Sequence, residues 1–136
     1  MIPCERIAEL FADLFGSPMS AGTVSNILMK GGQRSGPSVA RIEQELRSAP
    51  VVHADETGAS LGGVGHWLHV ACTSLLSRFY FHPKRGMEGL EDMGILPGYK
   101  GKVIHDFFQS YYHYDSYSHG LCNARHLRDL TYIHEV

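Results

Sequence analysis

The pattern of apolar residues changes at Pro50, and this change constrains the fold more than any other feature of the sequence. Before Pro50, apolar residues recur at the spacing of amphipathic helices. After it come short runs rich in β-branched and aromatic residues, separated by glycine-rich turns. The chain is therefore predicted to be an α/β protein, with a helical segment over residues 1–48 and a second domain over residues 49–136.

The helical segment is predicted to contain three helices. Apolar residues mark an amphipathic helix over residues 4–15, which residues 16–18 (Gly-Ser-Pro) end. Ser20 is a good N-cap for a second helix, which Gly31 and Gly32 are expected to end. A further helix is expected near Ser38–Ser48.

Two short helices joined by a tight turn resemble a helix-turn-helix, in which the second helix reads DNA. The residues that the second helix would expose to DNA are small or polar: Thr23, Ser25, Asn26 and Lys30. The alternative is a plain helical hairpin that packs on another surface. Both interpretations remain open from the residues alone.

The second domain is predicted to contain four strands, with glycine-rich or short connections between the first three. A short helix near Met87–Met93 separates the third strand from the fourth, so the fourth is expected to run parallel to an earlier one. A closing helix is expected over about 121–133. The four strands are expected at residues 51–55, 66–72, 75–82 and 102–106, and the first turn at Gly58, Gly62, Gly63 and Gly65.

This order of elements is that of the first part of an RNase H-like fold, in which the fourth strand lies beside the first. A full fold of that kind needs a fifth strand and at least one more helix, and neither is expected in this sequence. The predicted domain is therefore incomplete: three antiparallel strands, a helix, a parallel fourth strand and a helix.

Two aspartates, Asp55 and Asp106, each follow an apolar run that the pattern assigns to a strand. On neighbouring parallel strands, about 4.8 Å apart, their carboxylates would be close enough to share divalent metal ions. Hard oxygen ligands select Mg²⁺ or Mn²⁺, which serve phosphoryl transfer. The alternative is that each acid is an ordinary turn or capping residue. His53 and His105 precede the aspartates and are candidates to hydrogen-bond near such a site.

Seven ordered segments are more specific than any single spacing. They resemble the corresponding segments of transposases of the bacterial insertion sequence sixty-six family, and together they span nearly the whole chain. The segments are Asp13–Val24, Val52–Gly58, His66–Val70, His82–Gly86, Gly94–Pro97, Val103–Asp106 and Cys122–Leu130.

The resemblance implies a DDE transposase, which nicks DNA at element ends and joins the freed 3′-hydroxyls to target DNA. Asp55 matches the first catalytic aspartate of the family and Asp106 the second. The third acid, a glutamate on a later helix, has no counterpart, because Glu135 follows Asp106 too closely. The family commonly has a Cys-x-x-His pair after the second aspartate. Here Arg125 stands three residues after Cys122, where the histidine would be, and the histidine comes one position later, at His126. Two such residues alone would be too few for structural zinc, which needs four ligands.

Charge and cysteine content bear on partners and location. The formal net charge of −2 is unlike that of most free-standing DNA-binding domains, which are basic. Lys84 and Arg85 are nevertheless candidates for DNA phosphate contacts, or else solvated side chains. Three cysteines favour a reducing compartment, and no apolar run approaches a membrane span. We expect a bacterial cytoplasmic, nucleoid-associated protein without a membrane or small-molecule partner.

The main hypothesis is a partial DDE transposase that binds element ends and target DNA, uses Mg²⁺ or Mn²⁺, and is catalytically incomplete by itself. A homo-oligomer is expected by analogy alone. Two alternatives remain: a DNA-binding module without chemistry, acting through residues 4–30, and a small RNase H-type metal-dependent nuclease that needs only two acids.

Overall fold

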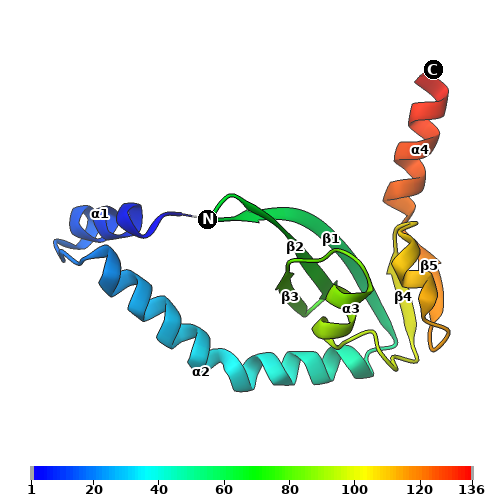
Figure 1. Ribbon diagram of the computed structural model, residues 1–136, viewed down its shortest axis with the longest axis horizontal. Helices are drawn as coiled ribbons and strands as arrows, with labels where there is room; N and C mark the ends of the chain where they lie inside the picture. The colour runs from blue at the N-terminus through cyan, green and yellow to red at the C-terminus, as the bar shows by residue number, and fades with distance from the viewer. Residues whose placement is uncertain (1, 136) are drawn as a thin grey trace. The chain divides into compact units, whose positions relative to one another are not determined.

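Figure 1 presents the computed structural model, which describes residues 2–135. The chain divides into two compact units, Met1–Ala40 and Arg41–Val136, and the division falls inside helix α2 (Ala21–Ser48). The sequence placed this boundary after residue 48. The difference arises because the last turns of α2 belong to the core of the second unit, where Leu46 is fully buried.

The first unit contains α1 (Cys4–Phe15) and the beginning of α2. Helix α1 ends as predicted, because Gly16 adopts the left-handed conformation (φ 59°) and its N–H donates to the Ala12 carbonyl at 3.0 Å. The N-cap prediction for α2 is also confirmed, since the Thr23 N–H donates to Ser20 Oγ at 3.0 Å.

Helix α2 does not end at Gly31 and Gly32, and the prediction of two separate helices over residues 20–48 is wrong. The helix runs for 28 residues, through both glycines and through Pro37. Neither glycine has the positive φ of a helix-ending glycine. Each glycine disfavours the helix by about 1 kcal/mol relative to alanine. That cost weakens the helix without ending it, because each further residue adds a backbone hydrogen bond once the helix has formed.

The second unit is built on a five-stranded mixed sheet with the order β3-β2-β1-β4-β5. Strands β1, β2 and β3 pair antiparallel, and β4 lies parallel beside β1, so both predictions are confirmed. The helix α3 (Met87–Met93) lies between β3 and β4 in the chain, as predicted. The strands are β1 (Val51–Leu61), β2 (Val64–Cys72), β3 (Ser77–His82), β4 (Lys102–His105) and β5 (Ser118–Leu121).

The first hairpin is longer than predicted. Only Gly62 and Gly63 form the turn, and their positive φ values of 58° and 81° match the primed turns that join two-residue hairpins. Gly58 and Gly65 lie inside the paired strands. The first strand therefore continues six residues past Asp55, to Leu61.

Strand β5 contradicts the prediction that this sequence lacks a fifth strand. Its four residues, Ser118 to Leu121, have little intrinsic β-preference, which is why their pattern gave no signal. The strand forms because the edge of β4 offers backbone partners. The Ser118 N–H donates to the Gly101 carbonyl at 3.0 Å, and the Cys122 N–H donates to the His105 carbonyl at 2.9 Å. Helix α4 (Asn123–Glu135) follows, starting two residues later than predicted.

One face of the sheet carries the hydrophobic core. Burial alternates along β1, so that Val52, Ala54 and Glu56 face the core while His53 and Asp55 face the other side. The core face is covered by the end of α2, by α3 and by the segments around β4. Its buried apolar residues are Leu46, Val52, Ala54, Ala71, Leu90, Met93, Ile95, Leu96, Tyr99, Val103, Tyr111 and Tyr117.

None of the helices in the described part of the chain has the length and apolar character needed to cross a bilayer.

Candidate functional site

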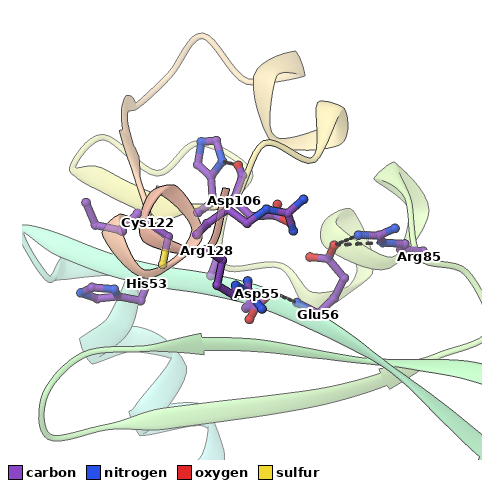
Figure 2. Close-up of a pocket in the computed structure, with 11 residues that line it drawn as sticks. His53, Asp55, Glu56, Arg85, Asp106, Cys122 and Arg128 are labelled. Carbon is purple, nitrogen blue, oxygen red and sulfur yellow. Dashed lines mark hydrogen bonds and ion pairs between the residues drawn. The ribbon is translucent and has the colours of Figure 1, made fainter. Parts of the chain in front are cut away.

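A pocket of about 390 Å³ lies where β4 ends beside β1 (Figure 2). Residues from four parts of the second unit line it: β1, the turn after β3, the end of β4 and the beginning of α4. They include Asp55, Asp106, Glu56 and three arginines.

The strand register brings Asp55 and Asp106 together. In the parallel pair β1–β4, Val51 lies opposite Lys102 and His53 opposite Ile104, a constant offset of 51 residues. Asp106 directly follows the last residue of β4, and the same offset, continued past the end of that strand, matches it with Asp55 on β1. The axes of neighbouring strands lie about 4.8 Å apart, and both aspartates line the pocket. The sequence predicted that each aspartate ends a strand. For Asp55 this is wrong, because β1 continues to pair with β2 there and Val70 lies opposite it. Asp106 lies one residue beyond the end of β4.

Each aspartate is oriented by one backbone hydrogen bond. Asp55 Oδ1 accepts the Glu56 N–H at 2.9 Å, and Asp106 Oδ1 accepts the Phe108 N–H at 2.8 Å. Among the described residues, Oδ2 of each carboxylate has no hydrogen-bond donor. Asp55 is exposed and Asp106 is half-buried, so both can be reached from the pocket.

These two carboxylates supply the right kind of donor for Mg²⁺ or Mn²⁺, but only two of the six oxygens that such an ion takes. Among the described residues, no group of three or more His, Cys, Asp or Glu side chains could hold a metal ion. The remaining ligands would have to be waters, phosphate oxygens or a further acid.

Glu56 is the acid that sequence analysis missed. Its side chain is completely buried, and its two oxygens accept three hydrogen bonds. Arg85 donates from Nε and Nη2 to Oε1 at 3.0 and 2.8 Å, and the Tyr111 hydroxyl donates to Oε2 at 2.6 Å. Burial, together with the Glu56 charge, raises the pKa of Tyr111, so this hydroxyl stays protonated and remains a donor.

Arg85 is held in place by aromatic rings as well as by Glu56. Its guanidinium lies 4.0 Å from the centre of the Phe108 ring and 4.9 Å from that of Trp67. Figure 2 shows Glu56 and Arg85 joined beside Asp55. The sequence identified Arg85 as a phosphate-contact candidate, and the structure places its guanidinium on an internal carboxylate. Lys84 is exposed, and its carbonyl accepts a hydrogen bond from His69 Nε2 at 3.0 Å.

The two histidines that precede the aspartates have different surroundings. His53 is exposed on the same face as Asp55 and lines the pocket. His105 points to the core, where it is 1% exposed, stacks on Tyr111 at 4.6 Å and shares a 2.9 Å hydrogen bond between its Nε2 and His119 Nδ1. Burial lowers the pKa of His105. The Nδ1 of His105 contacts the backbone carbonyl oxygen of Asp106. His105 therefore interacts with the backbone of that residue and not with its carboxylate.

Helix α4 contributes residues that sequence analysis did not single out. Arg125 and Arg128 line the pocket together with Cys122, which directly precedes the helix. His126 packs edge-on against Phe107, with ring centres 5.2 Å apart, and does not line the pocket. The side chain of Glu135 falls outside the described part of the chain. The sequence does contain a pattern that could have identified Arg125 and Arg128: they are three residues apart, a spacing that puts two side chains on one face of a helix.

The candidate DNA-reading residues all lie on α2 in the first unit and are exposed. Thr23 takes part in the helix cap, since its hydroxyl lies 3.0 Å from Ser20 Oγ. Ser25, Asn26 and Lys30 follow over the next two turns.

The comparisons with known proteins agree with the ordered motifs. A search of curated proteins gives no match. The family model described as "Transposase IS66 family" matches residues 1–136. Because that match includes the helical unit as well as the sheet that brings Asp55 and Asp106 together, the chain belongs to the IS66 family of transposases.

Proposed function

We propose that the second unit is the metal-binding part of a DDE-type catalytic core that acts in DNA transposition, with Asp55 and Asp106 as metal ligands. The observation that carries this proposal is that Asp55 on β1 and Asp106, directly after the neighbouring strand β4, line one pocket. Among the described residues, one oxygen of each carboxylate has no donor. The family membership supports DNA, as element ends and target, as the substrate.

An RNase H-like fold is part of the proposal. Three antiparallel strands followed by two parallel strands, in the order β3-β2-β1-β4-β5, support it. The position of Asp55 on β1 and of Asp106 directly after the adjacent strand β4 also supports it. The fifth strand, which the sequence did not predict, adds to this support.

Asp55 and Asp106 would hold Mg²⁺ or Mn²⁺. Bound there, such ions supply acidity to an attacking water or 3′-hydroxyl and stabilise the leaving oxygen. The protein's own contribution is to fix the two carboxylates through the Glu56 and Phe108 amides. We propose that strand transfer requires a third acid in addition to Asp55 and Asp106, because these two carboxylates supply only part of the oxygen ligands that a divalent ion takes.

Metal binding tests the assignment directly. Titration of the purified chain with Mn²⁺, followed by water-proton relaxation, should show binding that weakens by about tenfold or more in Asp55→Asn and Asp106→Asn, because each change removes one charged ligand. Asp115→Asn is the matched control, since Asp115 is exposed and has no hydrogen bond or ion pair among the described residues. Equal Mn²⁺ affinity in all four proteins would rule out the proposed site.

A second candidate function, DNA binding through the first unit, is favoured by the charge along α2. Residues 21–40 contain Lys30 and Arg34 and no acid, and α2 exposes Ser25 and Asn26 on its first turns. Duplex binding that weakens in Lys30→Gln and falls steeply with salt would support it. Binding that is independent of Lys30 would exclude this role. The small-nuclease alternative would require Asp55-dependent cleavage of nucleic acid by the isolated chain.

A further inference from the structure

Two arginines of α4 reach the pocket of the aspartates without being fully engaged elsewhere. Arg125 and Arg128 are three residues apart on the helix, so their side chains lie on one face. Both line the pocket with Asp55 and Asp106, and Figure 2 shows Arg128 beside the two aspartates. Arg125 has one ion pair, 3.4 Å to Asp129, with both side chains about half exposed, and Arg128 has none among the described residues.

The charges of the pocket form two groups. It is lined by three carboxylates and three guanidinium groups, and Arg85 is already bound to Glu56. Two aspartates and two arginines are left to face the open space. Divalent ions on the aspartates would therefore leave the pocket with a net positive charge on its α4 side, next to the point where phosphoryl chemistry would take place.

We propose that Arg125 and Arg128 form a phosphate-binding subsite that holds a phosphodiester of the DNA backbone beside the two aspartates. This inference rests on the proposed function for its substrate class. Guanidinium groups suit the role because their planar donors bind phosphate oxygens bidentately. The surface ion pair of Arg125 does not compete strongly, since exposed pairs on helices contribute little. Contacts of this kind position DNA without reading its sequence.

The experiment measures binding of a short fluorescein-labelled DNA duplex to the full chain by anisotropy, in EDTA, over a series of salt concentrations. We expect Arg125→Gln/Arg128→Gln to weaken binding by about tenfold and to reduce the slope of log affinity against log salt by about 0.9, for the one phosphate that the two arginines neutralise. Arg41→Gln is the matched control, because Arg41 forms the same kind of exposed i, i+4 pair with Glu45. It should change the affinity by less than about twofold.

A second variant separates charge from helix structure. Arg125→Lys/Arg128→Lys keeps both charges and should retain most of the salt slope while losing part of the affinity. A loss as large as that of the glutamine variant would overturn the proposal, and so would wild-type binding by the glutamine variant. Inorganic phosphate is added as a competitor. If it displaces the duplex at a concentration equal to that of the duplex's phosphate groups, the subsite binds free phosphate and the DNA assignment is overturned.

The design keeps this inference apart from the proposed metal site. The binding measurements contain no metal, so they do not depend on ions held by Asp55 and Asp106. If Asp55→Asn keeps full Mn²⁺ affinity while the arginine variants lose duplex binding, the metal site fails and the phosphate subsite stands. The opposite pattern of results overturns the subsite alone.

Discussion

Replacing Glu56 with alanine should strongly destabilise the second unit, although this residue contributes almost nothing to the solvent-exposed surface. Its carboxylate is buried and accepts three hydrogen bonds, two from Arg85 and one from the Tyr111 hydroxyl. The alanine variant leaves that hydroxyl buried without an acceptor, which costs about 1–3 kcal/mol. It also removes the partner of Arg85.

The contribution of the Glu56–Arg85 ion pair to stability is smaller than that of a fully buried pair, because solvent screens it. Breaking a fully buried pair costs about 3–5 kcal/mol, but the Arg85 side chain is 40% exposed and can be rehydrated, so about 1 kcal/mol is the better figure. Together the two effects give a loss of about 2–4 kcal/mol in the free energy of unfolding. Arg85→Ala is expected to cost about as much, because it leaves the Glu56 carboxylate buried with a single donor.

Urea unfolding followed by tryptophan fluorescence is a suitable assay. Trp67 is the only tryptophan of the chain, and its ring lies against the Arg85 guanidinium, so the signal reports on this part of the molecule. The free energy of unfolding is obtained by linear extrapolation. A Glu56→Ala protein within about 0.5 kcal/mol of the wild type would refute the reasoning, since ordinary surface changes fall in that range.

Two further predictions concern packing and pH. Gly89→Ala should destabilise the second unit by about 1–3 kcal/mol, because an added Cβ would lie 2.7 Å from the Lys84 carbonyl oxygen and against the His69 ring. Thermal unfolding measures this loss, and an unchanged melting temperature would contradict the prediction. Tyr114→Phe should stabilise the protein at neutral pH by up to about 1 kcal/mol, because the buried Tyr114 hydroxyl has no hydrogen-bond partner among the described residues. Burial raises the pKa of Tyr114 to about 12, above its unfolded value of about 10, so ionisation of this residue does not reduce stability below pH 10 but lowers it as pH rises from about 10 to about 12. Urea unfolding between those values should show a shallower fall in stability for Tyr114→Phe than for the wild type.

The central part of the fold could be predicted because its signals are local. Short runs rich in apolar and aromatic residues in β2 and β3, and the apolar runs before Asp55 and Asp106, identify strands from neighbouring residues alone. The helix between β3 and β4 then requires a parallel crossover, which places β4 beside an earlier strand. The adjacency of the two aspartates follows from these steps.

The features that escaped prediction depend on distant partners. Strand β5 has a weak sequence pattern and forms through the backbone edge of β4. The continuation of α2 through Gly31 and Gly32 could not be predicted from helix propensity, because glycine occurs both at the ends of helices and within them. The Glu56–Arg85 pair joins residues 29 positions apart, and no local pattern selects one arginine over another.

Among the described residues, Asp55 and Asp106 each accept one hydrogen bond, from a backbone amide, and no hydrogen bond joins the two acids directly. Glu56 completes the arrangement, because successive strand residues face opposite sides and it enters the core where Asp55 enters the pocket. There it accepts a hydrogen bond from Tyr111, which lies in the segment directly after Asp106. One buried carboxylate thus ties together the two chain segments that carry the exposed ones. Arg85, which lies between Trp67 and Phe108, pairs with this buried carboxylate at the edge of the pocket.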